Sequence, residues 1–196
     1  MNPFEYCLIT DRSLYRIPVD AVAAAAELAG VHFIVLREKD LPPAGLVAAA
    51  RAVRKVLHRT KLIINGCLDV ALVSGAEGVH LQKDNLPVRS IRERFPELII
   101  GYSAHSVEEM KEAEQDGADY VFVSPVFAPA SKTSPLKPLG TNLVSSWCRS
   151  VKIKVFGLGG ISAGNVGRIR DCGCDGAAGI SLFIENGEFT SKGMVI

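Results

Sequence analysis

The chain has 196 residues, 48% of them hydrophobic and 22% charged, with 22 basic side chains against 21 acidic ones. This composition is typical of a soluble globular protein with enough apolar material for a core. The near-zero net charge excludes binding of nucleic acid or an anionic membrane through a strong bulk field. No apolar run approaches the ~20 residues of a transmembrane helix. The first ten residues lack the features of a signal peptide, so we expect a cytoplasmic protein.

Short apolar runs alternate with helical patterns along the whole chain. The runs are rich in Val, Ile and Leu and lack the strict alternation of a half-exposed sheet, so they predict strands covered on both faces. The predicted strands span 6–9, 33–36, 62–64, 78–81, 98–100, 120–123, 154–158 and 176–180. The predicted helices span 19–28, 42–57, 67–73, 87–95, 106–116 and 162–171.

Strand–helix alternation predicts a parallel sheet. Eight strands in 196 residues favour a single (β/α)₈ TIM barrel over residues 1–196, although about 24 residues for each unit is compact for that fold. An open, doubly wound sheet is the alternative. The 15 residues after Ser181 show poor helical periodicity, which predicts a short or irregular eighth helix.

Polar or glycine residues follow each apolar run. In a barrel the carboxyl ends of the strands meet at one mouth, where active sites lie. The sequence therefore predicts a shared site at the mouth. Its candidate residues include Thr10, Arg37, Asn65, His80, Ser103, Ser124, Gly159 and Ser181.

A glycine-rich segment, Gly157-Leu-Gly-Gly-Ile161, precedes a predicted helix start at Ser162. Glycines let backbone N–H groups approach an anion, and a helix N-terminus adds partial positive charge. Barrels often bind phosphate with the loops after strands seven and eight. These loops predict a phosphate site, for which a plain tight turn is the alternative. The predicted phosphate-binding residues are Gly159, Gly160, Ile180 and Ser181.

Two cations follow the second predicted strand. Arg37 and Lys39 share the same strand parity, so both are predicted to point into the mouth. Paired cations suit a phosphate or diphosphate. A solvated cluster paired with Glu38 and Asp40 is the alternative.

The long segment 124–140 contains four prolines and could close over an anionic ligand as a lid, with an inert loop as the alternative. Ser131 and Lys132 would then contact the ligand. His80 and His105 lie near strand tips and are candidates for acid–base chemistry, with structural hydrogen bonding as the alternative. The five cysteines are expected to be reduced structural thiols, because nothing indicates secretion.

Taken together, these residues resemble the thiamin phosphate synthase/TenI family. The matching segments appear in family order over nearly the whole chain. They are 8–11, 36–39, 62–65, 78–80, 100–105, 117–120, 124–127, 157–161 and 176–181. The resemblance implies a barrel enzyme of thiamin biosynthesis. The family's synthases join hydroxymethylpyrimidine diphosphate to thiazole phosphate with Mg²⁺ and release diphosphate, whereas TenI-type proteins are thiazole tautomerases that need no metal.

The resemblance also implies roles for individual residues. Gly160, Ile180 and Ser181 match the thiazole phosphate site, and Pro125 is synthase-like. The residues that match synthase contacts around the pyrimidine and its diphosphate are Arg37, Lys39, Asn65, Ser103, Ser131 and Lys132.

The chain departs from the synthase pattern at the metal. The two carboxylates that hold Mg²⁺ in synthases fall at Gly66 and Asn85, with Asp84 one residue away, and a glutamine that contacts the pyrimidine is Val35 here. Mg²⁺ is a hard cation that prefers carboxylate oxygens, so these losses disfavour metal-assisted departure of diphosphate.

The pair Asn65-Gly66 and the segment 91–96 are TenI-like. The histidine proposed as proton shuttle in TenI, however, falls at Pro125, which cannot titrate. A tautomerase would need His80, Asp84 or His105 as its acid or base.

The sequence thus predicts a TenI-like thiazole tautomerase without a cofactor. The alternatives are a thiamin phosphate synthase with Asp84 as the sole carboxylate ligand of Mg²⁺, a non-catalytic regulatory protein that binds thiazole or thiamin phosphate, and another phosphate-binding barrel enzyme such as an isomerase. The expected partner is a small phosphorylated thiazole or pyrimidine rather than nucleic acid or membrane. The family resemblance also leads us to expect a homo-oligomer.

Overall fold

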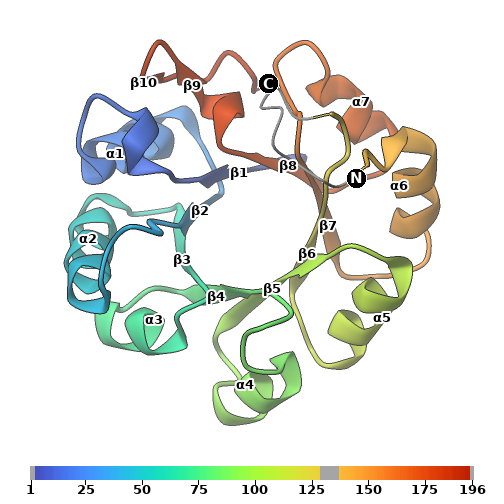
Figure 1. The fold of residues 1–196 in the computed structure, drawn as a ribbon, viewed down its shortest axis with the longest axis horizontal. Helices are drawn as coiled ribbons and strands as arrows, with labels where there is room; N and C mark the ends of the chain where they lie inside the picture. The colour runs from blue at the N-terminus through green and yellow to red at the C-terminus, as the bar shows by residue number, and fades with distance from the viewer. Residues whose placement is uncertain (1–2, 129–136, 195–196) are drawn as a thin grey trace.

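Eight parallel strands form a closed barrel in the computed structural model, which describes residues 3–128 and 137–194 (Figure 1). Each strand pairs in parallel with the next, and β8 closes the ring by pairing with β1, where Leu8 lies opposite Gly179. The predicted barrel is confirmed, and the alternative of an open sheet is wrong. The strands are β1 Glu5–Ile9, β2 Phe33–Leu36, β3 Lys61–Asn65, β4 Gly78–Leu81, β5 Ile99–Ala104, β6 Tyr120–Val123, β7 Lys154–Leu158 and β8 Gly176–Gly179.

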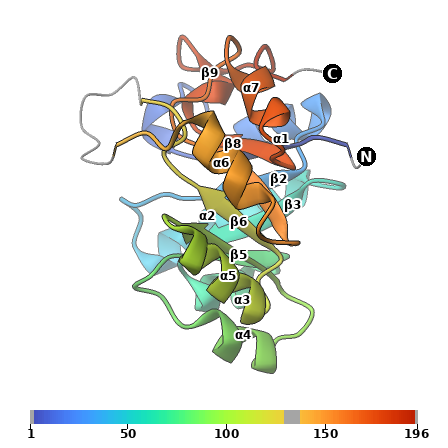
Figure 2. The same cartoon turned by 90° about the vertical axis from the view of Figure 1, so that its right-hand side faces the viewer.

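Helices surround the barrel on its outside; α4 and α5 lie on one side and α7 on the opposite side (Figures 1 and 2). Each helix turns an apolar stripe towards the strands, as with Leu46, Ala50 and Val53 of α2, which are buried at helical spacing. The helices are α1 Val19–Ala29, α2 Pro43–Val56, α3 Leu68–Ser74, α4 Val88–Arg94, α5 Val107–Gln115, α6 Gly140–Cys148 and α7 Val166–Asp171.

Two helices differ from the sequence prediction. No helix was predicted at α6, where Leu139 provides no side-chain cap and only Val144 and Trp147 are buried. Helix α7 begins at Val166 rather than at Ser162, so the expected helix start beside the glycine segment is wrong. The side chain of Asn165 holds the preceding turn, because its Oδ1 accepts from Ser162 N at 2.8 Å.

The chain after β8 forms a 3₁₀ turn, η2 (Ser181–Phe183), and a hairpin of β9 (Ile184–Glu185) and β10 (Glu188–Phe189). Within the described residues this segment replaces the eighth α-helix, which confirms the expectation of a short or irregular element. Phe183 is fully buried and stacks on Phe189 with ring centroids 6.1 Å apart. The 3₁₀ turn and the hairpin therefore cover the outside of the barrel where an eighth helix would lie.

Aromatic side chains fill the barrel interior below the mouth. Tyr120, Phe122 and Phe156 are buried there and contact one another edge to face or tilted, with centroids 5.2–6.0 Å apart. Glycines make room for them, since a Cβ at Gly101 would lie 2.1 Å from the Tyr120 ring and one at Gly176 would lie 2.5 Å from Phe156. The mouth is consequently closed from below by packed rings. In the described part of the chain, no helix is both long and apolar enough to cross a membrane.

Candidate active site

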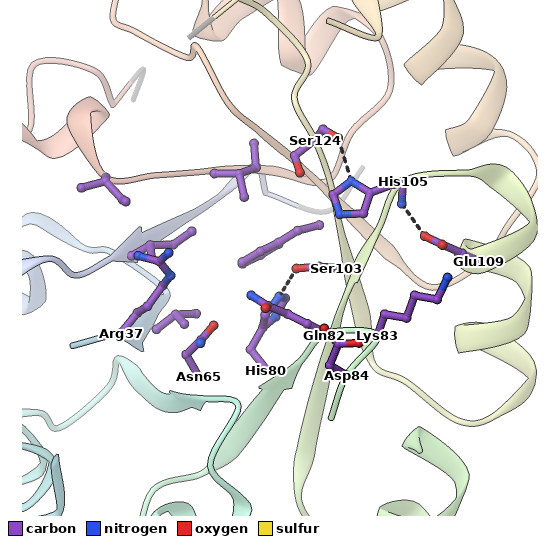
Figure 3. Close-up of a pocket in the computed structure, with 15 residues that line it drawn as sticks. Arg37, Asn65, His80, Gln82, Lys83, Asp84, Ser103, His105, Glu109 and Ser124 are labelled. Carbon is purple, nitrogen blue, oxygen red and sulfur yellow. Dashed lines mark hydrogen bonds between the residues drawn. The ribbon is translucent and has the colours of Figure 1, made fainter. Parts of the chain in front are cut away.

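Two adjoining cavities open at the carboxyl ends of the strands, and both are lined by Leu158 and Ile180. We call the first, of about 410 Å³, the side-chain pocket and the second, of about 700 Å³, the glycine cradle. Figure 3 shows the polar residues that surround the side-chain pocket, with Arg37 across the opening from Lys83 and His105. Its polar lining consists of Arg37, Asn65, His80, Gln82, Lys83, Asp84, Ser103, His105, Glu109 and Ser124.

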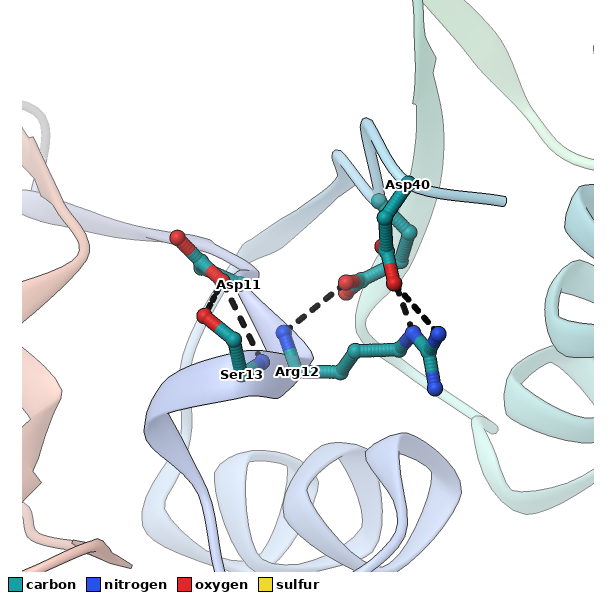
Figure 4. A network of polar contacts seen from close by, with 5 residues as sticks. Asp11, Arg12, Ser13 and Asp40 are labelled. Atoms are coloured by element: carbon teal, nitrogen blue, oxygen red, sulfur yellow. Dashed lines mark hydrogen bonds and ion pairs between the residues drawn. The ribbon is translucent and has the colours of Figure 1, made fainter. Parts of the chain in front are cut away.

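Arg37 is held at the pocket by a buried hydrogen-bond network. Its backbone N–H donates to Thr10 Oγ1 at 3.0 Å, and that hydroxyl donates to Glu38 Oε1 at 2.5 Å. The second oxygen of Glu38 accepts from Arg12 N at 2.8 Å, and the Arg12 guanidinium pairs with Asp40 (Figure 4). Thr10 and Glu38 are 0% and 5% exposed, so the loop after β2 is fixed by satisfied buried groups.

The other predicted substrate residues are placed differently. Asn65 ends β3 and lines the side-chain pocket. Lys39 is exposed in a turn and lines neither cavity. Strand β2 ends at Leu36, so strand parity no longer sets the direction of Lys39. Ser131 and Lys132 lie outside the described residues.

His80 forms part of the floor of the side-chain pocket. Its ring stacks on Phe122 with centroids 4.2 Å apart, its Nε2 lies 2.8 Å from Ser103 Oγ and its Nδ1 lies 3.2 Å from Tyr120 Oη. Burial lowers the pKa of His80 to about 3, so the ring is neutral. A neutral ring with both nitrogens occupied orients Ser103 and is poorly suited to exchange protons with a ligand. Ser103 itself lies inside β5, which continues four residues beyond its predicted end at 100.

His105 stands at the rim of the pocket with one ring nitrogen committed. Its Nδ1 donates to the carbonyl of Ser124 at 3.1 Å, and its backbone N–H donates to Glu109 at 2.7 Å. Because a carbonyl can only accept, Nδ1 carries a proton, and in the neutral ring Nε2 is then the acceptor. Ser106 caps α5 by accepting from Glu109 N at 3.1 Å, and the Glu109 carboxylate reaches back to the N–H of His105, the residue before this cap.

The positions of the two synthase carboxylates lie side by side but are uncharged. A Cβ on Gly66 would lie 3.4 Å from the amide nitrogen of Asn85, whose Oδ1 accepts from Gln82 N at 2.8 Å. Asp84 is exposed in the pocket lining and is in no ion pair of the described residues. No group of three or more His, Cys, Asp and Glu side chains in the described ranges could hold a metal ion. These residues do not fit a two-carboxylate site, and a Mg²⁺ at this loop would find one carboxylate in the pocket lining, that of Asp84.

The glycine cradle is built from backbone. Gly159 and Gly160 adopt φ of 93° and 65°, and a Cβ on Gly160 would lie 2.5 Å from the carbonyl oxygen of Ala128. The positive φ and this close approach both require glycine. The N–H groups of Gly160 and Ile161 donate to no acceptor in the described part of the chain, so they are available to an anion.

The opposite wall of the cradle is formed by Gly179, Ile180 and Ser181. Ser181 begins η2, the short extra turn that often completes phosphate sites after strands seven and eight. All the predicted phosphate-binding residues therefore meet in one cavity, although the helical contribution comes from η2 rather than from α7.

Comparisons with known proteins identify the family. The model of the family TMP-TENI, described as thiamine monophosphate synthase, matches residues 6–183. The putative thiamine-phosphate synthase 2 of Aquifex aeolicus is 36% identical over 90% of this chain and 96% of its own length. The thiamine-phosphate synthase of Moorella thermoacetica is 36% identical over 91% and 87%. The structure of thiamine phosphate pyrophosphorylase from Pyrococcus furiosus superposes with a TM-score of 0.82, at 32% identity over 94% of this chain and 90% of that one.

The chain belongs to the thiamine monophosphate synthase family. The resemblance found in the sequence and the expectation of an enzyme are both confirmed. The names of these relatives do not confirm the tautomerase prediction, and they favour the synthase alternative.

Sequence reasoning missed the residues that support the site from behind. Thr10 and Glu38 were visible at strand tips, but nothing in the sequence showed that they hydrogen-bond to each other across 28 positions. Glu109 lies in the first turn of α5 and fixes the backbone of His105. Lys83 follows the predicted fourth strand and supplies a second cation, in place of Lys39, to the pocket lining.

Proposed function

We propose that the chain is a thiamine-phosphate synthase, which joins a pyrimidinylmethyl diphosphate to a thiazole phosphate. The observation that carries this proposal is the pair of unlike cavities that share Leu158 and Ile180 as a wall. A tautomerase binds one heterocycle, whereas a coupling enzyme must hold two ligands side by side. The similarity to thiamine-phosphate synthases over about 90% of the chain supports the same activity.

The thiazole phosphate would occupy the glycine cradle. Its phosphate meets the free N–H groups of Gly160 and Ile161 on one side and Ser181 on the other. Its ring then reaches Leu158 and Ile180, the apolar residues between the cavities. Backbone donors would hold the phosphate with little flexibility, which would keep the ring at the wall that the two cavities share.

The pyrimidine diphosphate would occupy the side-chain pocket. Arg37 and Lys83 offer cations to the diphosphate from opposite sides of the opening (Figure 3). Asn65 and Ser103 offer an amide and a hydroxyl, and the hydrogen bond from His80 keeps that hydroxyl in place. The thiazole nitrogen forms a bond to the methylene carbon of the pyrimidine. The bond between that carbon and the diphosphate oxygen breaks, and diphosphate leaves with the electron pair.

A Mg²⁺ bound with the diphosphate would be held by Asp84 and would offset negative charge on the leaving group. The chain's own residues do the remaining work. Arg37 and Lys83 stabilise the leaving diphosphate, and the packed rings below the mouth keep water from the reacting carbon.

A coupling assay tests this function directly. The protein is incubated with both substrates and Mg²⁺, and the release of diphosphate is measured together with the formation of thiamin phosphate. Equal amounts of the two products, at an ordinary enzymatic rate and abolished when either substrate is left out, are the expected result. Absence of both products, with exchange of solvent deuterium into a carboxythiazole phosphate, would instead identify a tautomerase.

The tautomerase remains the second candidate because of one observation. His105 has its Nδ1 proton fixed by Ser124, which leaves Nε2 as a base at the rim of the pocket. Pro125, the residue after Ser124, cannot shuttle protons, so His105 would be the general base in such an enzyme.

A further inference from the structure

Three cysteine thiols meet outside the barrel, at the end opposite the mouth. Cys148 ends α6, Cys172 follows α7, and Cys174 lies two residues before β8. The Sγ atom of Cys174 lies 3.7 Å from that of Cys148 and 3.8 Å from that of Cys172, and all three are free thiols. A small movement would therefore bring the sulfur of Cys148 or of Cys172 to that of Cys174, which lies between them. A disulfide would need a sulfur–sulfur distance of about 2 Å.

One member of the cluster faces solvent through a polar groove. Cys172 lines a cavity of about 270 Å³ between α6 and α7, together with Arg168, Asp171 and three polar residues of α6. Cys172 and Cys174 are each 6% exposed and Cys148 is half-buried, but of the three only Cys172 lines this groove. A small polar oxidant that enters the groove therefore meets Cys172 rather than its two neighbours.

The hydrogen bonds within the cluster separate the three thiols chemically. The thiol of Cys174 contacts both neighbours, and its hydrogen bond to Cys172 lowers the pKa of Cys172 to about 7. The same contacts, together with burial, raise the pKa of Cys174. The thiolate therefore forms more readily at Cys172, whose thiol also donates to Ile169 O at 3.1 Å, than at Cys174, and this difference favours Cys172 as the thiol that reacts first.

We propose that these three cysteines form a hydrogen peroxide oxidation site in which Cys172 reacts first and a Cys148–Cys174 disulfide is the final product. The Cys172 thiolate attacks peroxide, the O–O bond breaks, and sulfenic acid and hydroxide form. The Cys174 sulfur then attacks the sulfenic sulfur, loses its proton and releases water. Two thiols and one peroxide thus become one disulfide and two waters.

A thiol–disulfide exchange completes the sequence. Cys148 lies 3.7 Å from Cys174 and attacks that sulfur, with loss of its own proton, while Cys172 leaves as a thiolate. A thiol with a lowered pKa is the better leaving group, and only Gly173 separates Cys172 from Cys174, so their disulfide would close a tight ring. The resulting bond joins the end of α6 to the segment that enters β8 and returns Cys172 to its original state.

The experiment oxidises the protein with a few equivalents of hydrogen peroxide at pH 7.5 and reads the products by mass spectrometry. The wild-type chain is expected to lose 2 Da, and a peptide map is expected to place the bond between Cys148 and Cys174. Cys172→Ala should slow this loss at least about tenfold. Cys174→Ala should stop at a sulfenic acid on Cys172, captured by dimedone, and Cys148→Ala should stop at the Cys172–Cys174 bond.

Cys67→Ala is the matched control, because Cys67 is half-buried directly before α3 and has no thiol neighbour in the described residues. Its oxidation should match that of the wild type. Capture of a sulfenic acid on Cys172 in briefly treated wild-type protein gives the same information if a variant fails to fold. A wild-type chain that gains oxygen without losing 2 Da, or a Cys172→Ala variant that forms the bond at the wild-type rate, would overturn the proposal.

Discussion

The two cavities at the mouth differ in what builds them. The glycine cradle consists of backbone, and its form depends on the absence of side chains, since a Cβ on Gly160 would meet a carbonyl oxygen at 2.5 Å. The side-chain pocket depends instead on which residues occupy its rim. The departures at the synthase metal positions, Gly66 and Asn85, lie beside this pocket rather than in the cradle. A backbone site can therefore be retained while the neighbouring chemistry changes, and the pocket must be tested to learn the reaction.

The largest expected effect comes from placing a charge in the cradle. Ser181→Asp puts a carboxylate beside the thiazole phosphate, and repulsion between like charges costs several kcal/mol, so affinity should fall by at least about 100-fold. Isothermal titration calorimetry with thiazole phosphate measures this affinity. Ser181→Asn, which is neutral and of equal size, should bind much more tightly than the aspartate variant. Equal affinities for the two variants would place the phosphate elsewhere.

Removing one of the two cations of the side-chain pocket should affect the pyrimidine diphosphate and not the thiazole phosphate. Arg37→Gln deletes a charged hydrogen-bond donor worth about 2 kcal/mol, so the KM for the pyrimidine diphosphate should rise about 30-fold. The KM for the thiazole phosphate should stay within about twofold of the wild-type value. Lys39→Gln is the matched control, because Lys39 is exposed and lines neither cavity. A rise in both KM values for Arg37→Gln would show that the two cavities do not act separately.

The floor of the side-chain pocket should make stability depend on pH. The pKa of His80 is about 3 in the fold against about 6.5 unfolded, so the unfolded chain binds the extra proton between these values. The stability that the protein gains by keeping His80 neutral is therefore complete above pH 6.5. It is lost as pH falls, and the free energy of unfolding drops by about 2 kcal/mol between pH 7 and pH 5. In His80→Asn the free energy of unfolding should fall by that much less over the same interval, measured by urea titration.

The control for the pH dependence is His58→Asn, which changes an exposed histidine of the loop after α2. That variant should keep the wild-type slope of stability against pH. A wild-type slope in His80→Asn would mean that the His80 ring is not held neutral in the pocket floor.

Restoring a carboxylate should sharpen the difference between the cavities. Asn85→Asp keeps an oxygen for the N–H of Gln82 and adds a hard ligand next to Asp84, so half-maximal coupling should need about fivefold less Mg²⁺. Thiazole phosphate binding should not change. A Mg²⁺ requirement equal to that of the wild type would show that this loop does not contact the metal.

The smallest effect is expected at the rim histidine. Coupling transfers no proton through His105, so His105→Gln should lower kcat by no more than about threefold. In a tautomerase the same change removes the base and would cost 10²-fold or more. Turnover of this variant in the coupling assay, beside its rate of proton exchange on the thiazole, distinguishes the two activities.

Much of the fold could be predicted because each strand and most helices carry local signals. The eight apolar runs, the proline that precedes α4 and the serine cap of α5 act within a few residues. Helix α6 escaped prediction because it has no side-chain cap and buries only two residues. The start of α7 was placed too early, because the turn before it depends on the Asn165 side chain bonding to Gly160 O at 2.9 Å.

The site was predicted best where it is made of backbone. Gly159 and Gly160 indicate a cradle by residue type alone, and both line it. The placement of Arg37 and Lys39 was harder, because it depends on where β2 ends and on the bond between Thr10 and Glu38, far apart in the chain. His80 was considered as an acid or base from its position alone. Only the packed rings around it show that it is neutral and structural.

A crystal soaked with thiazole phosphate and an unreactive pyrimidinylmethyl diphosphate analogue tests the central claim most directly. The account predicts both ligands in one protomer, with the phosphate against Gly160 and Ser181 and the diphosphate against Arg37. A phosphate of the thiazole bound at Arg37, or two ligands that displace each other from a single cavity, would contradict it.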